Sequence, residues 1–312
     1  MEDSKLKEMV NLHQDRNRQS AQMFEDFSMH REMISGVIQQ CLTALPPASI
    51  REPEAPAKSP TLTVWGAGNT NDLDLPAICA RFEIVQLIDL DLESLQRASQ
   101  RADLSDADRA KLRLVGNCDS TGLLPQLASL AESSGDGAND PTATFIADAV
   151  TARPRILSGG ETEILKTDVV VSACMLSQLI DSVFKTLGDD FERVNDVVLA
   201  VRDNHLRMLL DAVDTGSVVA LVTDFVSSDT LPALNNEMSS QEFLDLVVEA
   251  LNAKNFFTGT NPAALQQRLA LLYDDRQGFA GAAAGKLKVV MTQPWRWKFG
   301  KRSFAAIALV FA

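Results

Sequence analysis

The stretch "VWGAGNTNDLDLP", residues 64–76, places acidic side chains directly after a pair of glycines. A hydrophobic run leads into Gly66 and Gly68, and Asp72 and Asp74 follow. Glycines between a strand and a helix let a ligand approach the backbone and the free amides of the helix N-terminus. The stretch contains no Lys or Arg, so its aspartates would repel a bound pyrophosphate. The pattern therefore favours a ligand with an amine or cationic group and no phosphate.

Two other interpretations of this stretch stay open. A dinucleotide-binding GxGxxG loop would carry a third glycine where Asn71 stands, which disfavours a nicotinamide-dependent oxidoreductase. The glycines could also form a tight turn that holds no ligand. In that case Asp72 and Asp74 would serve only the N-terminus of the following helix.

Three further side chains are candidates for chemistry. His205 follows Val201 by four residues on a predicted helix, so we interpret it as a core histidine rather than a catalytic base. His30 belongs to a predicted N-terminal helix and would face the pocket only if that segment folds over it. Cys174 follows a predicted strand, and we expect an inert buried thiol there.

The segment "QPWRWKFGKR" has the most concentrated unusual composition. Trp295, Trp297 and Phe299 alternate with basic residues, and alternation is typical of a strand with one buried face. We expect a hairpin whose aromatic side chains pack inward while the cations face water. The alternative is an aromatic wall for a substrate.

The elements that position these residues follow an α/β pattern. Continuous Val, Ile and Leu runs alternate with helical stretches, which predicts right-handed βαβ units and an open, doubly wound, mostly parallel sheet. The predicted strands, in chain order, are "TLTVW", "FEIVQLIDLD", "KLRLVGN", "DVVVSA", "SVVALVTDFV", "KLKVVMTQ" and "SFAAIALVF". The last two read as strands joined by a loop.

The chain divides by composition into three parts. We predict an N-terminal helical extension over 1–50 that serves as a lid, a proline-rich linker over 51–60 and a main domain over 61–312. Two insertions interrupt the main domain, near 132–166 and 227–285. Insertions at the carboxyl ends of strands are where substrate covers usually lie.

The first insertion contains "RILSGGETEIL", which resembles a small hairpin turned by Ser158, Gly159 and Gly160. The second carries two predicted helices, "SQEFLDLVVEALNAK" and "PAALQQRLALLYDDR".

Composition excludes several classes of protein. The 312 residues carry a formal charge of −13, which makes nucleic acid a poor partner. No run of about 18 apolar residues occurs, and the charged first twenty residues do not read as a secretory signal, so we expect no membrane segment and a cytoplasmic location. The four cysteines form no CxxC pair and only three histidines accompany them, which argues against a zinc site or a disulfide framework.

In their order, these motifs resemble the class I S-adenosylmethionine-dependent methyltransferases. "VWGAGNTND" is similar to the family's glycine loop, and "VQLIDLD" places Asp89 at the end of the second strand, 23 residues after Gly66. "LVGNCDS" resembles the loop after the third strand, and "DVVVSACMLSQL" resembles the fourth strand and its loop. The final segment resembles the antiparallel hairpin that closes the family's sheet. The resemblance covers residues 61–312.

This resemblance implies a Rossmann-like methyltransferase fold with seven mostly parallel strands and S-adenosyl-L-methionine as cofactor. Asp89 would receive the ribose hydroxyls, and Asp119 would meet the adenine amino group. The implied cofactor-binding residues are Gly66, Ala67, Gly68, Asn69, Asp72, Asp89, Leu90, Asp119 and Ser172. The chain departs from the pattern at Val64, where the family often has an acidic residue, and at Thr70, where a small residue is expected.

The methyl acceptor is the least constrained part of the prediction. The Asn-Pro-Pro-aromatic signature of amine- and base-modifying relatives is replaced by "SACM" after the fourth strand. We therefore expect a small-molecule acceptor beneath a lid made by 1–50 and 227–285, with no catalytic residue assigned. A methyltransferase-like module without activity is the alternative that Val64 and Thr70 favour.

Overall fold

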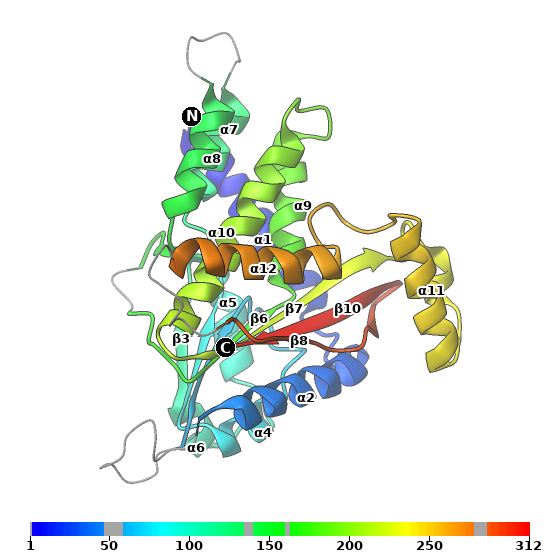
Figure 1. Ribbon diagram of the computed structural model, residues 1–312. Coiled ribbons are helices and arrows are strands. Elements are labelled where there is room, and N and C mark those ends of the chain that lie inside the picture. Colours follow the sequence, from blue (N-terminus) through cyan, green and yellow to red (C-terminus); the bar gives the residue numbers. More distant parts are fainter. Residues whose placement is uncertain (1, 47–58, 134–139, 160–162, 278–285) are drawn as a thin grey trace.

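A computed structural model describes residues 2–46, 59–133, 140–159, 163–277 and 286–312 (Figure 1). Its main sheet follows the strand order β3-β2-β1-β6-β7-β10-β8, and β9 also pairs with β10. The strands are β1 (Thr61–Trp65), β2 (Ile84–Ile88), β3 (Leu112–Val115), β6 (Val169–Ala173), β7 (Val218–Ser227), β8 (Val289–Met291), β9 (Trp295–Phe299) and β10 (Arg302–Phe311). The pairs among β3, β2, β1, β6 and β7 are parallel, whereas β10 is antiparallel to its three neighbours. The predicted open, doubly wound and mostly parallel sheet is confirmed, and β9 adds an eighth strand to the seven that were predicted.

The C-terminal edge differs from the prediction in one respect. The segment expected to be a loop between the last two strands contains β9, which pairs with the first half of β10, while β8 pairs with its end. The expected hairpin with inward aromatics is confirmed: Trp295 and Trp297 are buried, while Lys298 is exposed. The alternation of aromatic and basic residues predicted this strand correctly, because one face of the strand packs against the protein.

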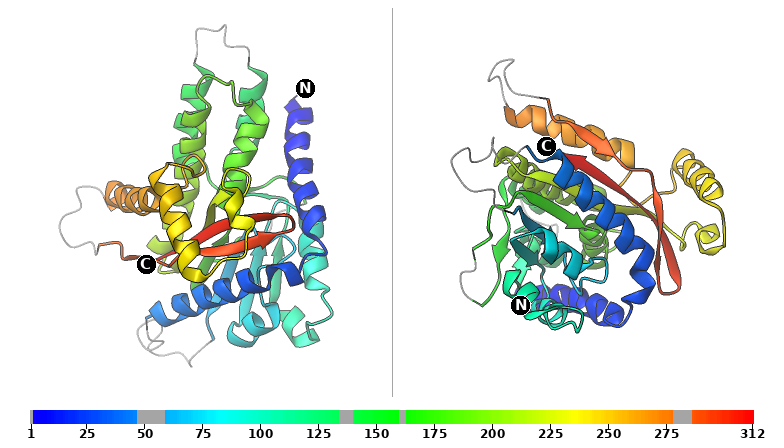
Figure 2. Two further views of the ribbon diagram at one scale, coloured as in Figure 1. Left: turned by 90° about the vertical axis from the view of Figure 1, so that its right-hand side faces the viewer. Right: turned by 90° about the horizontal axis from the view of Figure 1, so that it is seen from below.

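Helices cover both faces of the sheet (Figure 2). One buried apolar cluster joins α2, α4 and α5 to one face, and a second cluster joins α7, α8, α9, α10 and α12 to the other. The helices are α1 (Glu2–Ser20), α2 (Ser28–Ala44), α4 (Leu75–Arg81), α5 (Leu92–Ser99), α6 (Asp106–Lys111), α7 (Leu124–Glu132), α8 (Pro141–Thr151), α9 (Met175–Leu187), α10 (Val194–Asp214), α11 (Ser240–Asn252) and α12 (Pro262–Gln277). The result is the layered core expected of a doubly wound domain.

The N-terminal extension consists of two helices that play different parts. The short 3-10 helix Glu25–Phe27 separates α1 from α2. The apolar residues of α2, including Ile34 and Ile38, are buried in the core, whereas α1 packs against α7 and α5. Most of the predicted 51–60 linker lies outside the described residues.

The first insertion does not form the predicted hairpin in the part that is described. The strand β5 (Arg155–Ile156) pairs with β4 (Cys118–Asp119), which follows β3, rather than with a return strand of its own. Gly160, at the predicted turn, lies outside the described residues. Short strands take whichever edge the tertiary structure brings near, and here that edge belongs to the loop after β3.

Within these described ranges, no helix combines the length and apolar character needed to cross a membrane.

Candidate functional site

The glycine loop lies where β1, β2 and β6 end together. Gly66 has φ +72° and Gly68 has φ +47°, both in the left-handed region that favours glycine. A Cβ on Gly66 would lie 3.1 Å from Cβ of Met175 and 3.2 Å from the carbonyl oxygen of Ala173. Close approach between the loop and the start of α9 therefore requires a residue without a side chain at Gly66.

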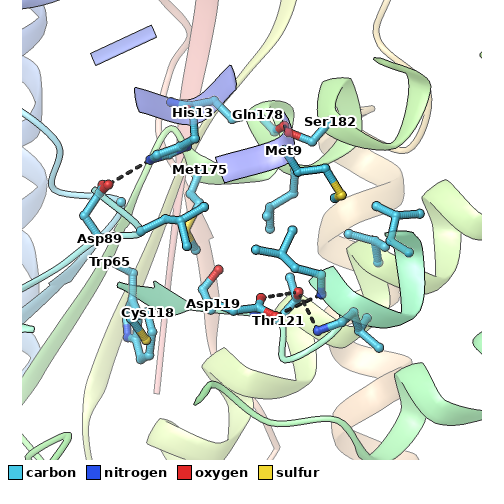
Figure 3. A pocket seen from close by; sticks show the side chains of 18 of the residues that line it. Met9, His13, Trp65, Asp89, Cys118, Asp119, Thr121, Met175, Gln178 and Ser182 are labelled. Carbon is cyan, nitrogen blue, oxygen red and sulfur yellow. Dashed lines mark hydrogen bonds and ion pairs between the residues drawn. The ribbon is translucent and has the colours of Figure 1, made fainter. Parts of the chain in front are cut away.

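Asp89 is a buried carboxylate at this edge of the sheet, and several donors contact it. The backbone N–H of Gly68 donates to its Oδ2 at 2.8 Å, and that of Asp91 donates to Oδ1 at 2.9 Å. Nε2 of His13 lies 2.7 Å from Oδ1 (Figure 3). Burial raises the pKa of Asp89, but attraction to His13 and the hydrogen bonds from His13, Asp91 and Gly68 outweigh it and lower the pKa. Asp89 is therefore held as the carboxylate.

The helix α1 reaches this site with a polar face. His13, Asn17 and Ser20 recur at helical spacing and lie on the same face of the helix. The side-chain amide of Asn17 donates to Oδ2 of Asp91 at 3.1 Å, and that of Asn69 donates to Oγ of Ser20 at 3.0 Å. Sequence reasoning missed His13 and Asn17 because it followed apolar periodicity, although the spacing of these polar residues was visible.

A first cavity of about 60 Å³ remains beneath α1. Figure 3 shows several of its side chains around the space. Its lining includes Met9, His13, Trp65, Gly66, Ile88, Asp89, Leu90, Cys118, Asp119, Leu123, Leu127, Met175 and Gln178. Four of the predicted cofactor-binding residues thus line one cavity, namely Gly66, Asp89, Leu90 and Asp119. A volume of this size has room for only a few water molecules.

Asp119 lies in this lining, but its oxygens already accept hydrogen bonds from its own turn. The backbone N–H groups of Thr121 and Gly122 donate to Oδ1, each at 3.0 Å, and that of Leu124 donates to Oδ2 at 2.9 Å. Burial raises the pKa of Asp119 in spite of these donors. The structure therefore shows the turn role, in which Asp119 also accepts from the first N–H of α7 without being its N-cap residue, and the adenine contact stays a prediction.

Among the described residues, the remaining predicted positions lie outside the lining of the first cavity. The backbone of Ala67 belongs to the glycine loop, and Asn69 binds α1. Asp72 is buried, and this burial raises its pKa to about 7. Oγ of Ser172 lies 2.9 Å from Nε2 of His205 inside the core.

His205, His30 and Cys174 are buried, neutral groups of the core. Burial lowers the pKa of His205 to about 3, which agrees with the expected core histidine. His30 does reach Cys174, with Nε2 at 3.5 Å from Sγ, while the indole of Trp295 donates to Nδ1 at 2.9 Å. Burial also lowers the pKa of His30 to about 3 and raises that of the Cys174 thiol well above its usual range. This pair is neutral, and it provides no thiolate nucleophile.

A second, larger cavity of about 540 Å³ lies on the other side of the β6–α9 turn. Met175 lines the first cavity, Cys174 and Ser177 line the second, and Gln178 lines both. The second lining also includes Arg16, Asn17, Asp181, Lys185, Asp224, Phe256, Phe257, Trp297, Phe299, Arg302 and Phe304. It therefore joins α1, the second insertion and the C-terminal hairpin.

Asp224, near the end of β7, is the buried carboxyl group of the second cavity. Its side chain accepts a hydrogen bond from the hydroxyl of Ser177. Burial raises its pKa to about 6, and this effect outweighs the hydrogen bond from Ser177 and the attraction to Arg302. A buried carboxyl group in a cleft with a pKa near neutrality is suited to acid–base chemistry.

The described part of the chain brings no three His, Cys, Asp or Glu side chains into a group that could hold a metal.

Comparison with known proteins identifies similar solved structures only. No protein-family model and no curated protein matches the chain. The plantazolicin methyltransferase BpumL, solved with a desmethyl substrate analogue and SAH, shares 9% identity and a TM-score of 0.42, with 100% of this chain and 98% of that chain covered. The glycopeptide N-methyltransferase MtfA shares 11% identity and a TM-score of 0.38, with 92% and 90% covered. The methyltransferase domain of bacterial CtHen1 shares 13% identity and a TM-score of 0.36, with 81% and 89% covered.

Proposed function

We propose that this protein transfers a methyl group from S-adenosylmethionine to a small molecule. The observation that carries the proposal is Asp89, a buried carboxylate fixed by the N–H of Gly68 at the end of β2. An ionised carboxylate is acceptor-only and can take both hydroxyls of a ribose. Asp89 and the glycine loop thus provide the acceptor and the open backbone that such a cofactor needs.

The chemical character of the residues that line the first cavity fits this cofactor. Its walls are mostly apolar, as an adenine requires, and His13 is the only basic residue in its described lining. The space does not yet fit, because about 60 Å³ is far below the roughly 300 Å³ of the smallest ligand pockets. Binding therefore requires α1 to shift and His13 to release Oδ1 of Asp89.

The cofactor would supply a methyl group already activated by a positive sulfonium. The residues of this chain would align the two reactants and exclude water, since the charge is lost during transfer. Helix α1 covers both cavities, with His13 over the first and Arg16 over the second. We assign the acceptor to the second cavity, beneath α1 and the Phe256–Phe257 segment of the second insertion.

Calorimetry with S-adenosylhomocysteine tests the cofactor assignment. We expect binding by the unmodified protein, and a loss of about a hundredfold or more in affinity for Asp89→Ala, because the buried hydrogen bonds to a charged group would be lost. Asp74→Ala is the matched control, since Asp74 accepts from the N–H of Ala77 at the start of α4 and lines neither cavity among the described residues. No heat from S-adenosylhomocysteine or S-adenosylmethionine would refute the enzymatic function.

One observation favours a second candidate, a methyltransferase-like module without activity. In this structure α1 engages Asp89 through His13 and Asn17, so the residue that would bind ribose has protein partners. A cofactor found by mass spectrometry in the purified protein would decide against such a module.

A further inference from the structure

The second cavity separates its apolar and charged groups. Trp297 lies 5.1 Å from Phe304 and 5.8 Å from Phe299, measured between ring centroids, and Phe256 and Phe257 add to the lining. These rings form an aromatic wall, and a volume of about 540 Å³ lies within the range of small-molecule sites. The wall therefore suits a ligand with an aromatic or otherwise apolar body.

The cations that line this cavity already have acidic partners. Arg16 and Lys185 both pair with Asp181, and Arg302 pairs with Asp229. Such pairing weakens the attraction of these cations for an anionic ligand.

Asp224 is placed differently from these paired groups. It is 4% exposed, lines the same cavity and accepts from Ser177. Throughout the described ranges, no Lys, Arg or His forms an ion pair with it. A buried carboxyl group without a cationic partner favours a ligand that brings a positive charge or a hydrogen-bond donor.

We infer that the methyl acceptor is an amine carried on an aromatic or apolar body, an inference that rests on the proposed function. Its nitrogen would bind at Asp224, and its body would lie against Trp297, Phe299 and Phe304. The Asp224 carboxylate would first take a proton from the bound ammonium, which frees the nitrogen lone pair. This lone pair would then form the new N–C bond as the methyl carbon leaves the sulfonium, whose sulfur keeps the bonding pair, and the product is the methylated ammonium. Ser177 orients this carboxylate, and the neutral Cys174 beside it takes no part.

Calorimetry with matched ligand pairs tests the inference on the whole protein, with S-adenosylhomocysteine present. The probes are phenethylamine and tryptamine, each compared with the carboxylate of the same body, phenylpropionate and indole-3-propionate. We expect the amines to bind at least about tenfold more tightly, since a charge-assisted hydrogen bond to a buried group is worth this much or more. Carboxylates that bind as tightly as the amines, or amines that do not bind, would overturn the inference.

Asp224→Asn sharpens this test because it keeps the size of the side chain and removes its charge. We expect this variant to lose affinity for the amines by on the order of tenfold to a hundredfold and to bind S-adenosylhomocysteine as before. Asp245→Asn is the matched control, since Asp245 is exposed on α11 and bonds only Gln241 among the described residues. Unchanged amine affinity in Asp224→Asn would reject the assignment.

Two features keep the result decisive. If Asp224→Asn fails to fold, the comparison of amines with carboxylates on the unmodified protein still tests the inference. Binding of S-adenosylhomocysteine in the same samples separates the two proposals. Cofactor binding without amine binding rejects the acceptor class alone, whereas absence of cofactor binding rejects methyl transfer itself.

Discussion

The two cavities each contain a carboxyl group that is 4% exposed near the end of a parallel strand, yet the pKa values of the two groups are shifted in opposite directions. Asp89 receives hydrogen bonds from Gly68, Asp91 and His13, and its pKa is lowered in spite of burial. Asp224 has the hydroxyl of Ser177 as its side-chain donor, and burial raises its pKa to about 6. Burial alone therefore does not set the pKa of a carboxyl group; attraction to a nearby basic group, together with hydrogen bonds, can reverse its effect, as His13 does at Asp89.

The cavities also differ in the space that α1 leaves. Over the first cavity, His13 enters the site and about 60 Å³ remains, whereas about 540 Å³ remains over the second. Helix α1 thus fills most of the space in the proposed cofactor site, whereas it covers the proposed acceptor site and leaves that site open. The first cavity thus combines little space with a carboxylate that protein donors already contact. The second cavity combines open volume with Asp224, which has no ion-pair partner among the described residues.

The largest effect is expected from Asp224→Asn, measured as the free energy of unfolding at two pH values. Because the folded pKa of about 6 lies above that of an unfolded Asp, the native carboxyl keeps a proton that the unfolded chain releases between about pH 4 and pH 6. The residue therefore costs stability as the pH rises through this window. We expect the variant to be more stable at pH 8 by up to about 3 kcal/mol, with little difference at pH 4.

Urea unfolding at pH 4 and pH 8 measures this difference, and Asp245→Asn on the exposed face of α11 is the control. A variant that is less stable at pH 8 would show that Asp224 is held as a stabilised carboxylate like Asp89. An equal change at both pH values would show that the titration of Asp224 does not contribute to stability.

A smaller effect is expected from His13→Ala, which tests the other side of the comparison. Loss of the 2.7 Å contact should raise the pKa of Asp89 and lower the free energy of unfolding by about 1 to 2 kcal/mol at pH 7. Because the folded pKa of Asp89 is depressed, its contribution is present above the unfolded value and is lost as the pH falls through the folded pKa. The destabilisation should therefore shrink in acid.

NMR titration of the Asp89 carboxyl carbon and urea unfolding provide the two measurements. Asn11→Ala is the control, since Asn11 is exposed on the same helix. If the pKa of Asp89 stays unchanged without the imidazole, the backbone donors from Gly68 and Asp91 suffice to hold its charge.

The smallest effect is expected from Lys185→Ala at the rim of the second cavity. Its pair with Asp181 spans 2.9 Å, but the two side chains are 50% and 47% exposed, so solvent screens the attraction. We expect the free energy of unfolding to change by less than about 0.5 kcal/mol, measured by urea unfolding. A larger loss of unfolding free energy would mean that the ion pairs at this rim contribute substantially to stability.

Sequence reasoning worked where a pattern repeats locally. The apolar runs that became β1, β2, β6 and β7 were visible because strands buried on both faces need continuous hydrophobic residues. The alternation in Trp295–Phe299 showed which side chains would be buried. The pairing of β5 with β4 was missed, because two-residue strands carry too little periodicity to name a partner.

The candidate site was predictable in part for the same reason. Gly66 and Asp89 follow strands directly, and the ends of parallel strands meet at one edge of a sheet, so their neighbourhood follows from the order of elements. Asp119 was left open between ligand and turn, and its oxygens now bind its own turn. The contacts of His13 and Asn17 were not predicted, because the partners of polar side chains on an N-terminal helix depend on where that helix packs.

The order of glycine, aspartate and strand along the chain was enough to predict the sheet and the edge where a ligand site would lie, because local periodicity and strand order depend on near neighbours in sequence. The tertiary structure decided which charges survive burial and how much space remains. His13 meets Asp89 across 76 positions, and Ser177 meets Asp224 across 47. Contacts at such separations depend on how whole helices pack, and no residue pattern of this chain indicated that α1 would close one cavity and leave the other open.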